Sequence, residues 1–339
     1  MSSLRLRVRR GPGALLSVLL FVTAGPAFGR TLAAYKGAIV LDADSGRVLF
    51  ADNADEVSPP ASMTKLMTFS VLDDRIKAGA LSLQTRVTVV AADTRTSPSI
   101  IGLKPREVFP ISELIYAMMI PSANDAALAV AREVGGSVPA FVGLMNAKAR
   151  ALGMTHTTFR TPNGLPPPSR RIADGDLTTP RDFALLCRYV IRQTDVLHYT
   201  SVETRLFGVN YRYPPTPMTN HNHLLGKIAG VDGLKTGFTN GAGFCLAATA
   251  LRNGHRIIVV MMDCPDQRTR DLRVADLIEQ GFTTEIFTPP TVSTPGLSAP
   301  TRPTPPAAPP ITPVTPVAPV TPAEDGPPRI YVPGAPPAR

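Results

Sequence analysis

The sequence predicts an α+β domain, and two features of its apolar pattern carry this prediction. Short apolar runs typical of strands occur near residues 37–51 and again at 231–262. Between these regions, apolar residues recur at the three- and four-residue spacing of helices. Strands at both ends with helices inserted between them favour one domain, whose sheet would unite the first hairpin with the strands at 231–262.

The first strands are expected to form a β-hairpin. Residues 37–43 are typical of one strand, Asp44-Ser45-Gly46 of a turn, and 47–51 of the returning strand. Pro59-Pro60 then breaks the chain. A helix is predicted next, because apolar residues recur at helical spacing in Met63, Leu66, Met67, Val71 and Leu72.

The remaining elements follow from the same two periodicities. Further helices are predicted at 111–119, 126–134, 138–152 and 179–193. Strands are predicted at 231–236, 244–251 and 257–262, and a last helix at about 271–280. The resulting domain would occupy residues 30–288.

The N-terminal segment, residues 1–29, is typical of a secretory signal peptide. Four arginines lie within its first ten residues, a short apolar run spans 14–24, and Ala27-Phe28-Gly29 offers small residues for a signal peptidase. The apolar run is too short for a stable membrane anchor. The sequence therefore predicts export, while the choice between the general and the twin-arginine route stays open.

The C-terminal segment, residues 289–339, has a different composition. It contains 18 prolines, half of those in the chain. Such a segment cannot bury a core and lacks donors for a sheet, so we expect a disordered proline-rich tail. The tail would serve as a spacer or docking peptide, or it would have no role. No apolar helical face follows Phe287, which argues against membrane anchoring.

Net charge and cysteines exclude other classes. The net charge is +9, but the arginines of the N-terminal segment supply nearly half of it, and tryptophan is absent, so nucleic acid is not expected as a partner. Cys187, Cys245 and Cys264 are too few for a disulfide framework. A two-residue turn at Asn253-Gly254 would place Cys245 and Cys264 diagonally, which is long for a bridge, so we expect free buried thiols, although export would permit a disulfide.

One short motif offers a nucleophile. In Ser62-Met-Thr-Lys65, the serine and the lysine are three residues apart and would share one helix face. Serine needs a neighbouring base, and lysine serves when burial or a nearby cation lowers its pKa. An ordinary helix start explains the motif equally well when it is taken alone.

Two further motifs offer partners for this pair. Ser122-Ala-Asn124 places a hydroxyl and an amide on one loop, where they either relay a proton and orient a lysine or cap a helix. Lys235-Thr236-Gly237 ends a predicted strand and suits a substrate carboxylate lying against the backbone, although it is also a turn signal. The amides of Phe238 and Ser62 would form an oxyanion hole.

All three motifs in this order resemble the set found in β-lactamases and penicillin-binding proteins. Longer segments, 59–68, 122–127, 163–165, 178–182, 220–225 and 230–239, are similar to the serine-type D-alanyl-D-alanine carboxypeptidases, the low-molecular-mass penicillin-binding proteins of peptidase family S11. The resemblance covers roughly residues 35–285. It implies a β-lactamase/transpeptidase-like fold, with a central antiparallel sheet flanked by helices and a mainly helical subdomain.

The resemblance also implies functional residues. It assigns catalytic roles to Ser62, Lys65, Ser122 and Asn124, and substrate-binding roles to Lys235, Thr236, Gly237, Phe238 and Arg270. For Arg270 the alternative is a surface charge, although its guanidinium suits a carboxylate. No cofactor is expected, and no metal either, because His221 and His223 have no third ligand at a useful spacing.

The implied function is removal of the last D-alanine from peptidoglycan stem pentapeptides in the periplasm or cell envelope, through an acyl-enzyme on Ser62. Two alternatives are a D,D-endopeptidase that cuts cross-links and a non-catalytic wall-binding protein. A β-lactamase of class A would need a loop glutamate, and residues 155–180 contain only Asp174 and Asp176 as acids. We therefore expect β-lactams to act as covalent inhibitors. The sequence makes no prediction of oligomeric state.

Overall fold

The computed structural model describes residues 35–287, with side chains described up to residue 284. The predicted signal peptide and proline-rich tail lie outside the described residues. Within them, no single helix is long and apolar enough to cross a membrane; helices 124–135 and 138–151 pass that test only as a pair, bent by 84°.

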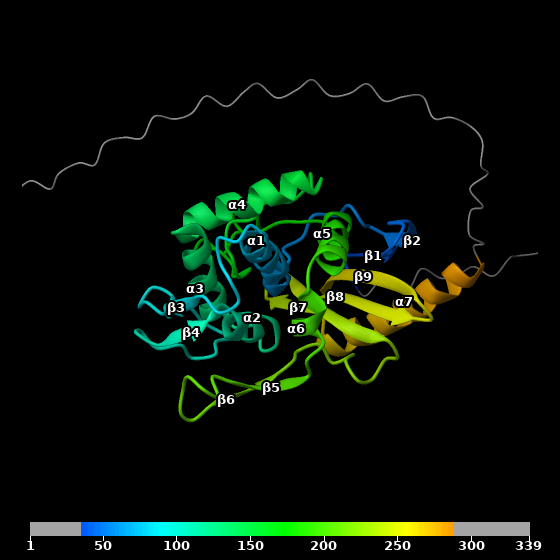
Figure 1. The fold of residues 1–339 in the computed structure, drawn as a ribbon. Helices are drawn as coiled ribbons and strands as arrows, with labels where there is room; N and C mark the ends of the chain where they lie inside the picture. Colours follow the sequence, from blue (N-terminus) through cyan, green and yellow to red (C-terminus); the bar gives the residue numbers. More distant parts are fainter. Residues whose placement is uncertain (1–34, 288–339) are drawn as a thin grey trace, which may run out of the picture. The chain divides into compact units, whose positions relative to one another are not determined.

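The centre of the fold is a five-stranded antiparallel sheet, with the strand order β2-β1-β9-β8-β7 (Figure 1). Its strands are β1 (Gly37–Asp42), β2 (Val48–Asp52), β7 (Val231–Thr239), β8 (Gly243–Arg252) and β9 (His255–Cys264). The predicted union of the first hairpin with the C-terminal strands is thus confirmed. In this order β7 is an edge strand.

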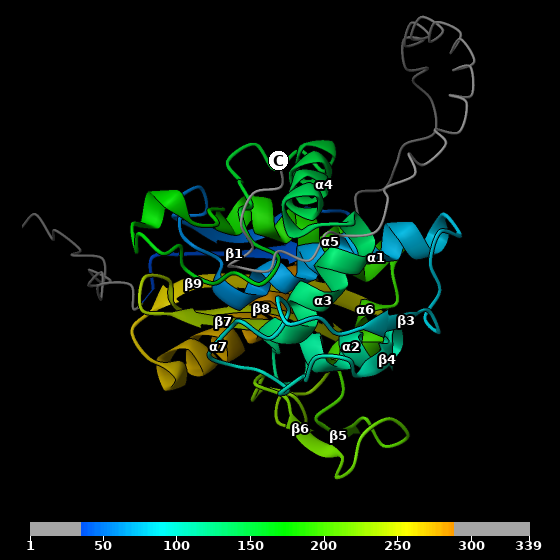
Figure 2. The same ribbon diagram turned by 90° about the vertical axis from the view of Figure 1, so that its left-hand side faces the viewer.

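The sheet separates two hydrophobic cores. Strand β1 is buried along its whole length, and its side chains alternate between the cores, as period two requires. Ile39 packs with the helices on one face, whereas Val40 packs with helix α7 (Gln267–Phe287) on the other. Figures 1 and 2 show α7 on one side of the sheet and α1 and α5 on the other.

The remaining elements are helices and two small hairpins, of which α2 to α5 agree closely with the predicted helices. The helices are η1 (Ala61–Thr64), α1 (Lys65–Lys77), α2 (Ile111–Met119), α3 (Asn124–Gly135), α4 (Val138–Ala151), η2 (Ile172–Asp174), α5 (Pro180–Gln193) and α6 (Val196–Thr200). Two small hairpins are built from β3 (Arg86–Thr88) with β4 (Val108–Pro110), and β5 (Thr204–Phe207) with β6 (Thr216–Thr219). Thr179 caps α5 by accepting from the Asp182 amide, which explains the predicted start.

Several boundaries differ from the predictions, and four features were not predicted at all: the β3–β4 hairpin, the β5–β6 hairpin, η2 and α6. Helix α7 begins at Gln267, four residues earlier than expected, and continues to Phe287. Ser62 lies on the 3₁₀ turn η1, not within an α-helix, and α1 begins at Lys65. The β5–β6 hairpin was not predicted, because its strands are only four residues long each and Pro217 lies in the second.

The expected diagonal arrangement of two cysteines was wrong. Arg252 pairs with His255 as predicted, but a bulge at Asp263 shifts the register so that Phe244 lies opposite Cys264. A one-residue shift moves a side chain to the other face of the sheet. Cys245 therefore packs in the core that contains α1, and Cys264 in the core that contains α7. Both are free buried thiols, as expected.

Candidate active site

A cleft of about 300 Å³ lies beside the edge strand β7. Six residues singled out from the sequence line it: Ser62, Ser122, Thr236, Gly237, Phe238 and Arg270. The other three, Lys65, Asn124 and Lys235, are buried, with at most 2% of each exposed. The fold thus brings the three motifs together, although nearly 60 residues separate the first from the second and more than 100 separate the second from the third.

Lys65 is held by three oxygen atoms. Its Nζ lies 2.9 Å from Ser62 Oγ, 2.7 Å from Asn124 Oδ1 and 2.9 Å from the carbonyl oxygen of Asn163. Burial, and secondly the charge of Lys235, hold the pKa of Lys65 well below 10.5. A neutral amine donates two hydrogens, here to Asn124 and Asn163, and its lone pair is then left to accept the Ser62 proton.

Asn124 connects Lys65 to the wall of the cleft. It begins helix α3, and its Nδ2 donates to the carbonyl oxygen of Pro98 at 2.5 Å. Its backbone amide donates to the carbonyl oxygen of Ser99 at 2.8 Å. The side-chain oxygen of Asn124 is thereby left to accept from Lys65.

Ser122 has two features of a functional residue. Its φ is +63°, which is strained for a serine, and Ser99, which also lines the cleft, has a φ of +56°. The Ser122 Oγ is buried and has no hydrogen-bond partner within residues 35–284. A buried hydroxyl without a partner is costly unless a ligand completes it, and this one lies in a residue that lines the cleft.

Strand β7 packs directly against the turn that carries Ser62. A Cβ on Gly237 would lie 2.6 Å from the Pro60 carbonyl oxygen and 3.2 Å from Ala61 Cβ. The sequence had suggested this glycine for close approach of substrate; the structure shows that close approach of η1 also requires it. This contact places Thr236 and Phe238 beside Ser62.

The cations of the site lie close to one another. Lys235 is 2% exposed, and its Nζ donates to the Thr236 carbonyl oxygen at 3.1 Å. Burial and the charge of Arg270 lower the pKa of Lys235 to about 7. Arg270 is 3% exposed and donates to Asp271 from Nε and Nη2 at 2.9 and 2.7 Å. The cluster suits an anionic group of a ligand, which would relieve the repulsion.

Several lining residues were missed by the sequence reasoning. His221, His223, Gln267 and Ser99 all line the cleft, and the two histidines had been considered only as metal ligands. Burial and Lys235 lower the pKa of His221 to about 4, so it is neutral at pH 7. Among the described residues, no group of three or more His, Cys, Asp or Glu side chains could hold a metal ion.

The cleft continues past the end of β7. A second cavity, of about 330 Å³, shares Pro98 and Phe238 with the first. A third, of about 350 Å³, shares Leu165, Pro166, Thr239 and Asn240 with the second. The three form one groove, whose far part is lined by the loop at 164–175 and includes Arg170 and Arg171.

A Ser-x-x-Lys turn beside the edge strand of an antiparallel sheet, with a second serine and a Lys-Thr-Gly strand, defines the class of penicillin-recognising serine acyl-transfer proteins. The D-alanyl-D-alanine carboxypeptidase family of S11 peptidases matches residues 25–266. The chain belongs to this family.

Known relatives and solved structures that resemble this chain agree with the family assignment. The chain is 37% identical to D-alanyl-D-alanine carboxypeptidase DacC of Escherichia coli over 72% of its length, and 30% identical to DacF of Bacillus subtilis over 73%. It spans about 60% of the length of these relatives. The ampicillin-bound penicillin-binding protein D2 of Listeria monocytogenes matches 74% of this chain and 97% of its own, with a TM-score of 0.65 and 33% identity. DacD of Francisella tularensis matches 73% and 70%, with a TM-score of 0.68 and 27% identity. The predicted penicillin-binding fold is confirmed.

Proposed function

We propose that the protein is an exported serine D-alanyl-D-alanine carboxypeptidase, which removes the terminal D-alanine from peptidoglycan stem pentapeptides. The observation that carries the proposal is the environment of Lys65, whose low pKa and two hydrogen-bond acceptors leave its lone pair for Ser62. The identity of the substrate is inferred from the family, whose members act on the bacterial cell wall. The site of action would be the periplasm or cell envelope.

The acylation step follows from these positions. Neutral Lys65 accepts the proton of Ser62 as Oγ attacks the penultimate carbonyl carbon of the peptide. The amides of Ser62 and Phe238 stabilise the resulting oxyanion. The C–N bond then breaks, and the leaving D-alanine takes a proton relayed from Lys65 through the Ser122 hydroxyl.

Substrate recognition relies on the C-terminal carboxylate of the stem peptide. The terminal carboxylate lies against Lys235, Thr236 and Arg270, where its charge is matched by two buried cations. The upstream residues of the stem peptide occupy the groove beyond Phe238. Water then attacks the acyl-enzyme, with Lys65 again accepting a proton, and the tetrapeptide leaves.

The two acids of the segment 155–180 favour slow release of a β-lactam. Asp176 is 4% exposed, and its carboxylate accepts hydrogen bonds from the amides of Arg160 and Thr161 and from the hydroxyls of Thr161 and Thr64. Asp174 is exposed and accepts from Ser169. Since neither carboxylate lines the cleft with Ser62, we propose that β-lactams bind as covalent inhibitors and are not consumed as by a β-lactamase.

The test uses two natural substrates in parallel. Purified protein is incubated with a pentapeptide-bearing muropeptide and with a cross-linked dimer, and products are measured by mass spectrometry. We expect free D-alanine from the first substrate with the wild type and none with Ser62→Ala. Cleavage of the dimer alone would replace the proposal by an endopeptidase, and no product from either substrate would favour a non-catalytic wall-binding protein.

A further inference from the structure

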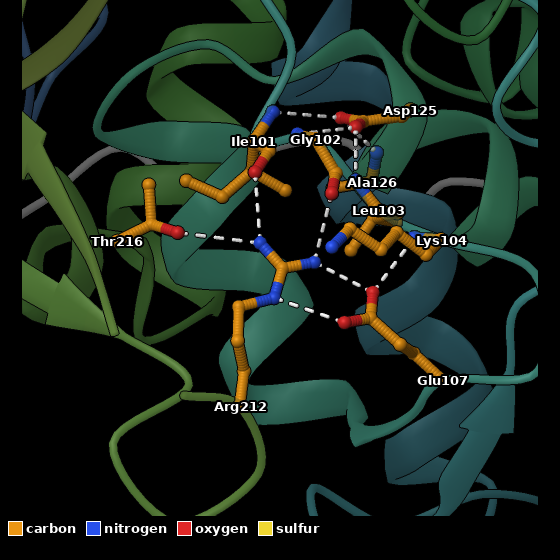
Figure 3. A network of polar contacts seen from close by, with 9 residues as sticks. All are labelled: Ile101, Gly102, Leu103, Lys104, Glu107, Asp125, Ala126, Arg212 and Thr216. Carbon is orange, nitrogen blue, oxygen red and sulfur yellow. Dashed lines mark hydrogen bonds and ion pairs between the residues drawn. The ribbon is translucent and has the colours of Figure 1, made fainter. Parts of the chain in front are cut away.

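An irregular segment between β3 and β4 builds one wall of the cleft. Its residues Ser97, Pro98 and Ser99 line the first two cavities, yet residues 97–103 contain no helix or strand. Backbone groups of such a segment need partners from elsewhere in the fold. The partners found here come from two separate elements and converge on residues 101–103 (Figure 3).

Asp125 binds the amide side of this segment. Its carboxylate accepts from the amides of Ile101, Gly102 and Leu103 at 3.1, 2.9 and 2.9 Å. The residue is 1% exposed and follows Asn124 at the start of α3. Hydrogen bonds to an ionised carboxylate are about twice as strong as neutral ones, so three of them attach the segment firmly to α3.

Arg212 binds the carbonyl side of the same segment. Its Nη1 donates to the Ile101 carbonyl oxygen at 3.0 Å, and its Nη2 donates to that of Gly102 at 2.9 Å. The guanidinium also donates to Glu107, at 3.1 Å from Nε and 2.6 Å from Nη2. Arg212 lies between β5 and β6, so the hairpin missed by the sequence reasoning reaches the wall of the cleft.

We propose that Asp125 and Arg212 are positioning residues for the acyl-transfer site. Together they bind the backbone of Ile101 and Gly102: Asp125 accepts from the two amides, and Arg212 donates to the two carbonyl oxygens. These contacts fix the position of the neighbouring residues Pro98 and Ser99, whose carbonyl oxygens accept hydrogen bonds from Asn124. Asn124 in turn accepts from Lys65, so the chain of contacts runs from the β5–β6 hairpin to the general base.

The geometry of Arg212 makes it the more informative residue to change. Its planar group serves two carbonyls and a carboxylate at once, which a lysine cannot do. Arg205 offers a matched control, because it lies on the same hairpin and donates to a carboxylate, Glu113, at 3.0 Å. Arg205 reaches helix α2 and makes no contact with residues 97–103 among its hydrogen bonds.

The inference rests on the proposed function, and the experiment separates the two. The first-order rate constant of acylation at saturating penicillin is measured for the wild type, Arg212→Ala, Arg212→Lys and Arg205→Ala, together with each melting temperature. We expect a loss of about tenfold in Arg212→Ala, a smaller loss in Arg212→Lys, and less than twofold in Arg205→Ala, because small misplacements in a site cost this much. Both alanine variants should melt at similar temperatures.

A double-mutant cycle then asks whether Arg212 acts through Asn124. In the Asn124→Ala background, adding Arg212→Ala should lower acylation by less than twofold. A full tenfold loss there, or a wild-type rate in Arg212→Ala, would overturn the inference while leaving the proposed function intact. If the wild type itself is not acylated, both are wrong. Arg212→Lys keeps the test decisive if Arg212→Ala does not fold.

Discussion

At the scale of single residues, the proposed mechanism places opposite requirements on two buried lysines. Lys65 must be neutral to accept a proton from Ser62, and no carboxylate donates or accepts a hydrogen bond at its Nζ among the described contacts. Lys235 must be charged to bind a carboxylate. Each cation disfavours the other, because the charge of Lys235 lowers the pKa of Lys65.

These requirements predict the pH dependence of kcat/KM for a pentapeptide. On the acid side, kcat/KM should fall as the pH drops through the pKa of Lys65, which burial holds well below 10.5, because the base becomes protonated. On the alkaline side it should fall above about pH 7, because Lys235, with a pKa of about 7, loses its charge.

The control for this profile is Lys235→Arg, whose side chain keeps its proton at every pH used. The decline above pH 7 should then disappear, while the acid side is retained. If kcat/KM of Lys235→Arg still fell above pH 7, the titration of another group would be responsible for the alkaline decline.

Lys235 should also reduce the stability of the fold. Its pKa is about 7 in the folded protein against about 10.4 in an unfolded chain, so between these values the unfolded state binds more protons and stability rises with pH. Below pH 7 the free-energy cost of burying the protonated lysine is fully present. Lys235→Met should therefore abolish carboxypeptidase activity yet stabilise the fold by about 1–4 kcal/mol.

Denaturant unfolding of wild type and Lys235→Met at pH 6 and pH 10 measures this effect. The stabilisation by methionine should be larger at pH 6, where the wild-type lysine is protonated in both states, than at pH 10. A variant that is less stable at both values would show that the lysine contributes favourable contacts that outweigh its desolvation.

At the scale of elements, the cleft depends on two close backbone contacts made by η1. Gly237 of β7 lies against one side of this turn, and Gly164 lies against Ala61, where a Cβ would fall 1.8 Å from the Ala61 carbonyl oxygen. Asn163, which precedes Gly164, accepts from Lys65. The turn that carries Ser62 is thus held between an edge strand and a loop more than 90 residues farther along the chain.

A pair of glycine variants separates contact from backbone strain. Gly164 and Gly153 have φ values of +79° and +76°, but a Cβ on Gly153 would meet no atom within 4 Å. Gly153→Ala should cost about 1–2 kcal/mol of stability from its left-handed backbone and leave acylation by penicillin unchanged. Gly164→Ala should cost more and slow acylation at least tenfold, because it displaces η1 or Asn163. Equal acylation rates in the two variants would contradict this account of the turn.

Elements were predicted well where periodicity alone decides them. Helix α2 matches its predicted bounds, and α3, α4 and α5 start and end within two residues of theirs. The bulge at Asp263 could not be predicted, because β9 is a continuous apolar run from Ile257 to Met262, with no glycine or proline to mark the break that follows. The 3₁₀ turn before α1 has the same apolar spacing as a helix and was read as one.

At the scale of the whole molecule, the site is assembled by sheet topology. The hairpin at the start of the chain pairs with β9, and the order of the sheet leaves β7 at an edge, next to η1. The helical layer brings the start of α3 to the same place. The three motifs could be read from the sequence because each is local and their order is shared with a family.

The rest of the site could not be read in this way. Asn163 binds Lys65 through its backbone oxygen, which any residue would supply, so no side-chain signal marks it. The loops at 97–103 and 164–172 line the groove through irregular backbone, whose path depends on tertiary contacts such as those of Arg212. His221 and His223 were considered in the sequence only as metal ligands, and no metal was expected there. Their position near Lys235 and Arg270 depends on the fold and could not be predicted from their spacing in the chain.

The most direct test of the central claim is the mass of the intact protein after brief incubation with penicillin, followed by mapping of the modified peptide. The wild type should gain one penicilloyl group on Ser62, and the adduct should persist, because the described residues that line the cleft with Ser62 include no carboxylate of the kind that activates water in a class A β-lactamase. Ser62→Ala should gain none. An unmodified wild type, or an equal adduct in Ser62→Ala, would contradict the assignment of Ser62 as the nucleophile.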